Sequence, residues 1–309
     1  MKTNKTISVV ISAILCSGIL FTGCGGGDNS SNSGNNNNSL FSKNAKLAEP
    51  TLENANKVAF ITKEFLPILK MPNINIDNLD MDKFNDIDEI QFTDTQDCDL
   101  NGSMTLTFNK NENYTNMTII FNDCKKGSLT INGSISTIAK NFDSNIGKYK
   151  NYITKFPTDF VIKPDDDIII FKYFANSYIE KNVNFDTNGN WKDYNLSTSL
   201  KMKFGIEDFG FQDCNFHFIN EDDFVKYYQT EGKIYINNLN SYVEYDKNYN
   251  MSVTPFKISN DDTLISGEAQ YIMSNNSKMK IVVLDPDNIE VEIDTDGDGE
   301  FELNESINE

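Results

Sequence analysis

Acidic side chains at regular spacing give the last part of this chain its clearest chemistry. Aspartates stand at every second position from 294 to 298, and glutamates follow at 300, 302 and 305. Calcium takes six to eight oxygen ligands, mostly from carboxylates and backbone carbonyls. The spacing can bring three aspartates, one backbone carbonyl and a bidentate glutamate around one ion. The candidate calcium ligands are Asp294, Asp296, Asp298, Glu300 and Glu305.

The stretch 294–305 resembles the calcium loop of EF-hand proteins. It has carboxylates at the first, third and fifth positions, Gly299 at the sixth, Phe301 at the eighth and Glu305 at the twelfth. Its flanks differ, because residues 289–293 alternate like a strand and the four residues after Glu305 leave no room for an exit helix. The stretch is therefore more similar to the isolated calcium loops of exported β-rich proteins.

A solvated hairpin turn is the alternative interpretation of the same aspartates. A turn at Gly297 pairs Ile293 with Phe301 and Val291 with Leu303. The two interpretations do not exclude each other, since one hairpin can also hold an ion.

Residues suited to catalysis are few, and the sequence predicts no enzyme and no catalytic residue. His217 is the only histidine, and strand alternation places it on the outer face, opposite Phe216 and Phe218. A Ser/His/Asp or Cys/His mechanism would need that histidine. Acidic runs at 165–167 and 221–223 could do acid/base work, but such runs are typical of solvated turns.

The N-terminus has the pattern of an export signal. Lys2 and Lys5 precede an apolar run over residues 7–21, which ends at Phe21-Thr22-Gly23-Cys24. The run is shorter than the roughly 20 residues that a membrane-spanning helix needs. A Gly/Ser/Asn stretch with little to bury follows it, which is typical of a flexible tether.

This N-terminus resembles the signal peptide of a bacterial lipoprotein. The resemblance implies that Cys24 carries a diacylglycerol and an acyl chain such as palmitate, and becomes the mature N-terminus. Several acyl chains hold a protein to a membrane far better than one. Gly25 after the cysteine implies the outer membrane in a Gram-negative source, and a Gram-positive source would imply the plasma membrane. The predicted location is therefore the cell envelope.

The acidic charge excludes some partners. The net charge is −19, and removal of Lys2 and Lys5 leaves 25 lysines against 46 acidic residues, hence −21. Such a charge repels phosphate backbones and anionic lipid heads. The predicted partners are the membrane, through the lipid anchor, and an unidentified envelope protein or glycan, but no nucleic acid.

Three cysteines follow Cys24 in the sequence. A turn near 111–112 places Met104 opposite Ile119 and brings Cys98 within one residue of Cys124. An oxidising compartment then favours a disulfide between these two cysteines. Cys214 is expected to be a buried apolar residue of a strand over 209–218. A set of residues resembles a motif of uncharacterised bacterial lipoproteins and names no activity: Cys98, Gly102, Phe121, Cys124 and Asn132-Gly133.

The predicted organisation is a signal peptide (1–23), a lipidated cysteine with its tether (24–45) and one β-rich domain (46–309). Apolar residues recur at helical spacing from about 50 to 70, with Pro50 in the first turn and Pro67 at the end. Beyond residue 90 the chain alternates like strands, with breaks predicted at 122–123, 188–189, 231–232 and 275–276. The predicted fold class is mainly β: a large antiparallel meander that forms a curved sheet or barrel-like sandwich, with one amphipathic helix.

These features favour a lipid-anchored envelope protein with a structural or partner-binding role and no catalytic activity. The alternative is an envelope carrier that holds a small apolar ligand inside the curved sheet, which would need a continuous apolar cavity. A third interpretation, an envelope hydrolase, would need carboxylates that converge in a cleft. Tyrosines crowd residues 227–249 and could form a shelf for a glycan, or could simply pack in the core.

Overall fold

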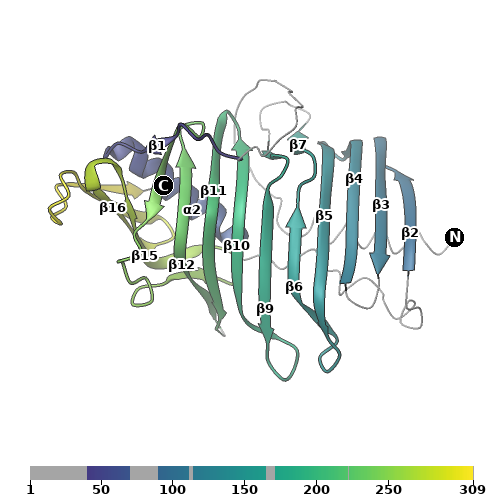
Figure 1. Ribbon diagram of the computed structural model, residues 1–309. Helices are drawn as coiled ribbons and strands as arrows, with labels where there is room; N and C mark the ends of the chain where they lie inside the picture. Colours follow the sequence, from purple (N-terminus) through teal and green to yellow (C-terminus); the bar gives the residue numbers. More distant parts are fainter. Residues whose placement is uncertain (1–39, 70–89, 111–113, 165–170, 222, 309) are drawn as a thin grey trace.

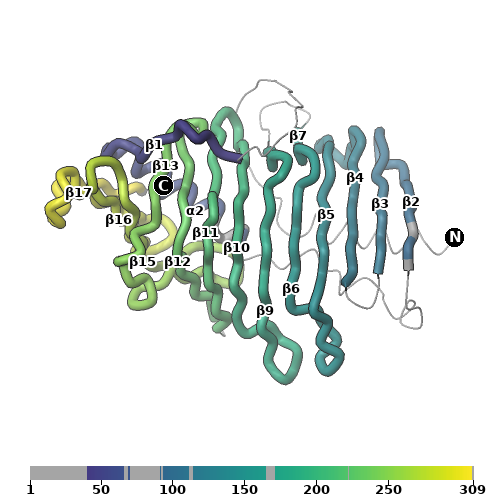
Figure 2. Tube along the Cα trace, in the orientation of Figure 1, coloured from purple at the N-terminus to yellow at the C-terminus, as the bar shows by residue number. Residues whose placement is uncertain are grey.

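Antiparallel β-structure dominates the computed structural model (Figure 1), which describes residues 40–69, 90–110, 114–164, 171–221 and 223–308. Within these residues the strands form one 18-stranded sheet, accompanied by the α-helix α2 (Leu52–Leu69) and the short 3-10 helix η3 (Ser274–Asn276). The sheet curves strongly at the end that carries the last strands (Figure 2). The predicted fold class is confirmed in the form of a curved antiparallel sheet.

The sheet is a meander in which most strands pair with the next one along the chain. Its main path runs β2, β3, β4, β5, β6, β9, β10, β11, β12, β13, β15, β16, β17 and β18, and β7, β8 and β14 pair beside it. The bounds are β1 (Lys46–Leu47), β2 (Ile90–Asp97), β3 (Asn101–Lys110), β4 (Tyr114–Lys126), β5 (Leu129–Asp143), β6 (Lys148–Lys155), β7 (Phe160–Pro164), β8 (Phe171–Tyr173), β9 (Tyr178–Phe185), β10 (Trp191–Phe204), β11 (Glu207–Asn220), β12 (Phe224–Ile236), β13 (Ser241–Tyr245), β14 (Phe256–Ser259), β15 (Leu264–Ile272), β16 (Lys278–Asp285), β17 (Asn288–Asp294) and β18 (Leu303–Asn308).

Two glycines allow long strands to change partners. Strand β5 pairs with β7 through residue 132 and with β6 from residue 136, and Gly133 lies between with φ of +106°. Strand β15 passes from β14 to β13 around Gly267, with φ of +133°. A Cβ at these positions would lie 2.0 Å from the Asp159 carbonyl oxygen and 2.4 Å from the Phe256 Cα. Any larger residue would therefore push neighbouring strands apart.

Two predicted turns are β-bulges instead. Asp123 (φ +47°) lies inside β4, where the register with β5 shifts between Phe121 and Cys124. Gly232 (φ +117°) lies inside β12, next to the register shift opposite Asn215. The prediction of breaks at 122–123 and 231–232 is wrong because residues that tolerate positive φ also suit bulges. The breaks at 188–189 and 275–276 are confirmed as the connections β9–β10 and β15–β16.

The β3–β4 hairpin carries a disulfide at its open end. Cys98 and Cys124 are bonded, with their Cα atoms 5.3 Å apart, and the strand register shifts between Asn101 and Ser103 and between Phe121 and Cys124. The predicted disulfide is thus confirmed in the structure. The predicted register is wrong by two residues, because Met104 pairs with Phe121 instead of Ile119. A shift of two keeps the apolar side chains on one face, which is why the pattern alone did not reveal it.

The predicted helix over about 50–70 is confirmed as α2, but neither proline marks one of its ends. Thr51 precedes the helix, and its hydroxyl oxygen accepts the Asn54 amide at 3.3 Å, which is an N-cap contact. Pro50 therefore lies before the cap and not in the first turn. The helix runs past Pro67 to Leu69, because a proline in the last turn removes one hydrogen bond without preventing the turn from closing.

The curved end of the sheet wraps around α2. The helix contacts β12, β17 and β18, and the ring centroids of Phe65 and Phe209, the latter in β11, lie 4.4 Å apart. Its buried face includes Val58 and Ile61. Burial of each such large side chain stabilises the fold by roughly 1.5–3 kcal/mol. The helix thus occupies the concave side of the curve.

The packed part of the chain begins within the predicted tether. Phe41 is only 4% exposed and stacks on Tyr235 with 4.3 Å between ring centroids. Gly210 makes room for it, since a Cβ there would lie 2.6 Å from the Phe41 ring. Strand β1 then pairs in parallel with β13. The predicted signal peptide, Cys24 and most of the tether lie outside the described residues; among those described, no helix is long and apolar enough to cross a membrane.

Candidate metal centre

The loop between β17 and β18 holds the acidic residues singled out from the sequence. The two strands form an antiparallel hairpin in which Ile293 pairs with Leu303 and Val291 with Glu305. A strand therefore enters the loop and a strand leaves it, as expected. The predicted pairing of Ile293 with Phe301 is wrong by two residues, since the loop is longer than a turn at Gly297 would make it.

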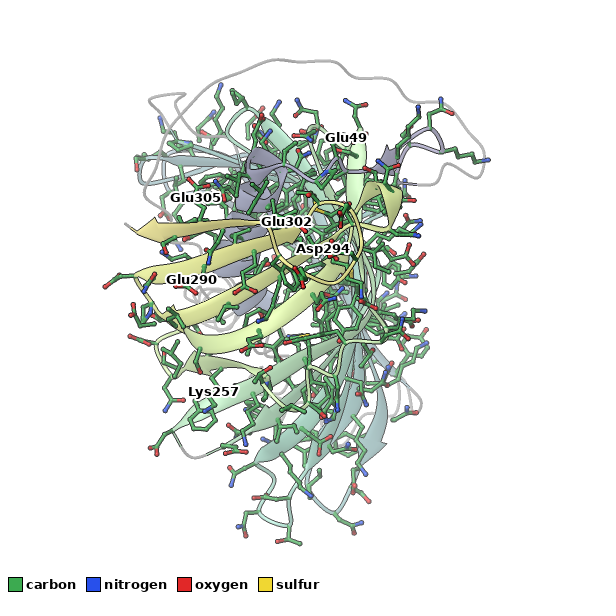
Figure 3. The ribbon with its side chains drawn as sticks, turned by 90° about the vertical axis from the view of Figure 1, so that its left-hand side faces the viewer. Glu49, Lys257, Glu290, Asp294, Glu302 and Glu305 are labelled. Carbon is green, nitrogen blue, oxygen red and sulfur yellow. A yellow bond between two sulfur atoms is a disulfide. The ribbon has the colours of Figure 1, made fainter. Side chains whose placement is uncertain are left out.

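Asp294 organises this loop from its first position (Figure 3). Its side chain is 0% exposed. One carboxylate oxygen accepts the Gly297 amide at 2.6 Å and the other accepts the Gly299 amide at 3.0 Å. Because the backbone has to wrap around both oxygens, the loop stays wide as far as Gly299, which accounts for the longer connection.

The other carboxylates of the loop are held by backbone amides. Asp296 accepts the Asp298 amide at 3.1 Å, and Asp298 accepts the Glu300 amide at 2.8 Å. Glu302 accepts both the amide and the hydroxyl of Thr295, at 2.7 and 2.8 Å. These two bonds, the amide first, lower the pKa of Glu302 below its usual value and keep its carboxylate ionised.

Four carboxylates meet in this loop. Asp294, Asp296, Asp298 and Glu302 each offer one oxygen, and these oxygens all lie within 4.8 Å of one another. Unit charges at that distance repel by about 1 kcal/mol per pair even in water. A divalent cation would offset this repulsion, and an all-oxygen donor set suits a hard cation such as calcium. The residues present therefore fit the predicted ion.

The structure brings together three of the five predicted ligands. Glu300 is exposed and contributes its backbone amide to Asp298 rather than its side chain to the cluster. Glu305 lies on β18, where its carboxylate accepts the Asn56 side-chain amide of α2 at 2.8 Å. Neither residue belongs to the four-carboxylate cluster.

Glu302 is the member of the carboxylate cluster that the EF-hand pattern does not predict. The EF-hand pattern expects the last ligand at the twelfth position, where an exit helix turns it back towards the ion. Here a strand leaves the loop, so Glu305 lies within β18 and bonds Asn56 of α2, and the residue directly before the strand, Glu302, faces the loop. The strand-like alternation over 289–293 favours a hairpin at this loop. In a hairpin the last carboxylate facing the loop comes before the exit strand, at Glu302 rather than Glu305.

The three cysteines in the described residues lie outside this loop. The bonded pair Cys98 and Cys124 belongs to the opposite end of the sheet, at β2–β4 (Figure 1). Cys214 is a free, buried thiol whose sulfur lies 3.4 Å from the Lys233 carbonyl oxygen. Burial raises the pKa of this thiol, so it stays protonated and unreactive in the folded protein. The expectation of a buried apolar cysteine is confirmed.

His217 lies on the outer face of β11, as predicted. Its Nδ1 lies 2.8 Å from the Asn195 side-chain oxygen, and its ring packs 5.2 Å from Tyr228. These described contacts, an amide and an aromatic ring, are not the nucleophile and carboxylate of a hydrolytic triad. Of the two acidic runs, residues 165–167 and 222 lie outside the described residues, and Glu221 pairs with Lys226.

The tyrosine-rich stretch mainly supplies core packing. Tyr227, Tyr235 and Tyr245 are buried, and Tyr227 stacks on Phe218 with 5.3 Å between ring centroids. The Tyr249 hydroxyl donates to Glu268 at 2.6 Å. The packing interpretation therefore describes these residues better than a glycan shelf.

No family model, curated protein or solved structure matches this chain. The functional interpretation therefore rests on the sequence and the geometry described above.

Proposed function

We propose that this protein is a lipid-anchored component of the cell envelope, with a structural or partner-binding role, whose last hairpin binds calcium. The single structural observation that carries the proposal is the group of four carboxylates with oxygens within 4.8 Å. The sequence Phe21-Thr22-Gly23-Cys24, at the end of an apolar run, supports the lipid anchor, and Gly25 after the cysteine supports an outer-membrane location in a Gram-negative source.

Calcium bound in this loop would stabilise the β17–β18 hairpin. Asp294 closes β17 and Glu302 directly precedes β18, so an ion shared by both would tie the two strands together. Within the described residues β18 pairs only with β17, so a bound ion would stabilise a strand pairing that no other strand supports. Extracellular calcium modules bind in the range of roughly 0.1–1 mM, and we expect a comparable affinity.

The packing around α2 argues against a ligand enclosed in the core of the curved sheet. The alternative of a carrier needs an apolar space enclosed within the curve, and Val58 and Phe65 of the helix are buried there instead. An envelope hydrolase would need carboxylates that converge in a cleft. The carboxylates that do converge in the described residues lie in an exposed loop and three of them are exposed.

Calorimetry of the purified protein tests the calcium part of the proposal. At about ten times the dissociation constant, binding stabilises the folded state by roughly 1–2 kcal/mol. For a domain of this size the melting temperature should rise by about 3–6 °C over the value with chelator. Magnesium should do less, because it demands octahedral geometry and retains its waters.

Matched variants decide whether the effect belongs to this loop. Asp296→Asn with Glu302→Gln should remove the calcium response, because two of the four negative charges are lost. The loop should keep its shape, because both amides retain an oxygen for the backbone contacts. Asp285→Asn is the control, because Asp285 accepts the Asp287 amide at 3.0 Å in the neighbouring turn, outside the cluster. Equal melting temperatures with chelator and with calcium in the parent protein would contradict the proposal.

A further inference from the structure

An apolar groove lies between α2 and the turn that joins β10 to β11. Its volume is about 550 Å³, within the range of small-molecule sites. Buried Ile61, Phe209 and Ile236 line it, together with two exposed apolar side chains, Phe60 at 44% and Ile206 at 64%. Together with the buried residues beneath them, these side chains offer apolar surface that a ligand would shield from water.

The rim of this groove is acidic. Lys57 bonds the Glu53 carboxylate at 2.9 Å and the Asn237 side-chain oxygen at 2.6 Å, so its charge is already compensated. Glu207 also lines the groove and makes no ion pair in the described part of the chain. One lysine against two glutamates leaves the rim with a net charge of −1.

We propose that this groove binds a small organic cation with an apolar body, such as an aryl-alkylammonium compound. The apolar body would lie against Phe60, Ile206 and the buried residues beneath them, and the ammonium group would lie at the rim beside Glu207. Aromatic rings add a favourable interaction with alkylammonium groups. The overall charge of −19 attracts cations to the protein and repels anions. This site is separate from the calcium loop and does not depend on the proposed function.

Isothermal titration calorimetry with three matched probes tests the charge preference. The purified full chain in phosphatidylcholine nanodiscs is titrated with 4-phenylbutylammonium, 4-phenylbutanol and 4-phenylbutyrate, with empty nanodiscs as the blank. The three probes share one apolar body and differ in charge. We expect saturable one-site binding of the ammonium compound, about tenfold tighter than that of the carboxylate, with the alcohol between them.

Three single substitutions locate the site. Glu207→Gln should weaken the ammonium compound about three- to fivefold and leave the alcohol unchanged. Ile206→Ser should weaken all three probes about fivefold. Val253→Ser is the control, since Val253 is 75% exposed and lies outside the groove. All three side chains are exposed, so the variants should keep the parent melting temperature.

Three results would overturn the proposal. The first is no saturable heat with the ammonium compound. The second is equal affinity for the ammonium compound and the carboxylate. The third is an affinity that is unchanged by Ile206→Ser or reduced equally by Val253→Ser.

Discussion

Removal of the disulfide should destabilise the protein by an amount that follows from its position in the chain. Cys98 and Cys124 are 26 residues apart, and chain entropy assigns about 3.5 kcal/mol at 25 °C to closing a loop of that length. For a domain of this size the loss corresponds to roughly 7–14 °C in melting temperature. We expect this loss in the double variant Cys98→Ser with Cys124→Ser.

Denaturant unfolding, measured with and without reductant, separates the cross-link from simple packing. Reductant should lower the free energy of unfolding of the parent to about that of the double variant, and should leave the double variant unchanged. A double variant within about 1 kcal/mol of the oxidised parent would refute the chain-entropy reasoning. If reductant leaves the free energy of unfolding of the parent unchanged while the double variant is strongly destabilised, the sulfur atoms act by packing instead.

Three further outcomes follow from single side chains. Glu305→Gln should keep the calcium-dependent rise in melting temperature and Glu302→Gln should weaken it; the reverse result would restore the EF-hand ligand set. Cys214 should resist alkylation in the folded protein and react on unfolding, as followed by mass spectrometry, and rapid labelling of the native protein would contradict its burial. Burial lowers the pKa of Lys181 to about 7, so the unfolded chain binds more protons above pH 7 and stability should rise with pH from about 7 towards 10.5. Denaturant unfolding of the parent should show about 2 kcal/mol of extra stabilisation between pH 7 and pH 9 relative to Lys181→Met, and identical pH dependence of the two proteins would count against this pKa.

Much of the fold could be predicted because it depends on local patterns. Alternating apolar residues identify strands such as β3, where Met104 and Leu106 are buried and Thr105 is not. The recurrence of Val58, Ile61 and Phe65 identified the helix. The spacing of Cys98 and Cys124 indicated their disulfide once their hairpin was recognised.

Other features depend on contacts between distant segments and could not be predicted in this way. Asp123 and Gly232 have the chemistry of turn residues, and only the neighbouring strands decide that they form bulges. Phe41 looked like part of a tether because its pocket, at Gly210 and Tyr235, comes from much later in the chain.

The sequence predicts an acidic metal site in this loop, but it identifies only three of the four carboxylates that form the cluster. Asp294, Asp296 and Asp298 are recognisable from their spacing alone. The fourth carboxylate depends on the register of β17 with β18, because Ile293 opposite Leu303 places Glu302 at the loop and Glu305 beside Asn56. Register is a property of the hairpin as a whole, and a linear ligand pattern does not contain it.

The lipid anchor is tested most directly by fatty-acid labelling of Cys24. Cells that make the protein are grown with labelled palmitate, and the purified chain is compared with Cys24→Ser, with Cys214→Ser as a cysteine control. The account predicts label in the parent and in Cys214→Ser, none in Cys24→Ser, and a mature parent chain that begins at Cys24. Label retained in Cys24→Ser, or an unlabelled parent protein, would contradict the claim that this is a lipid-anchored envelope protein.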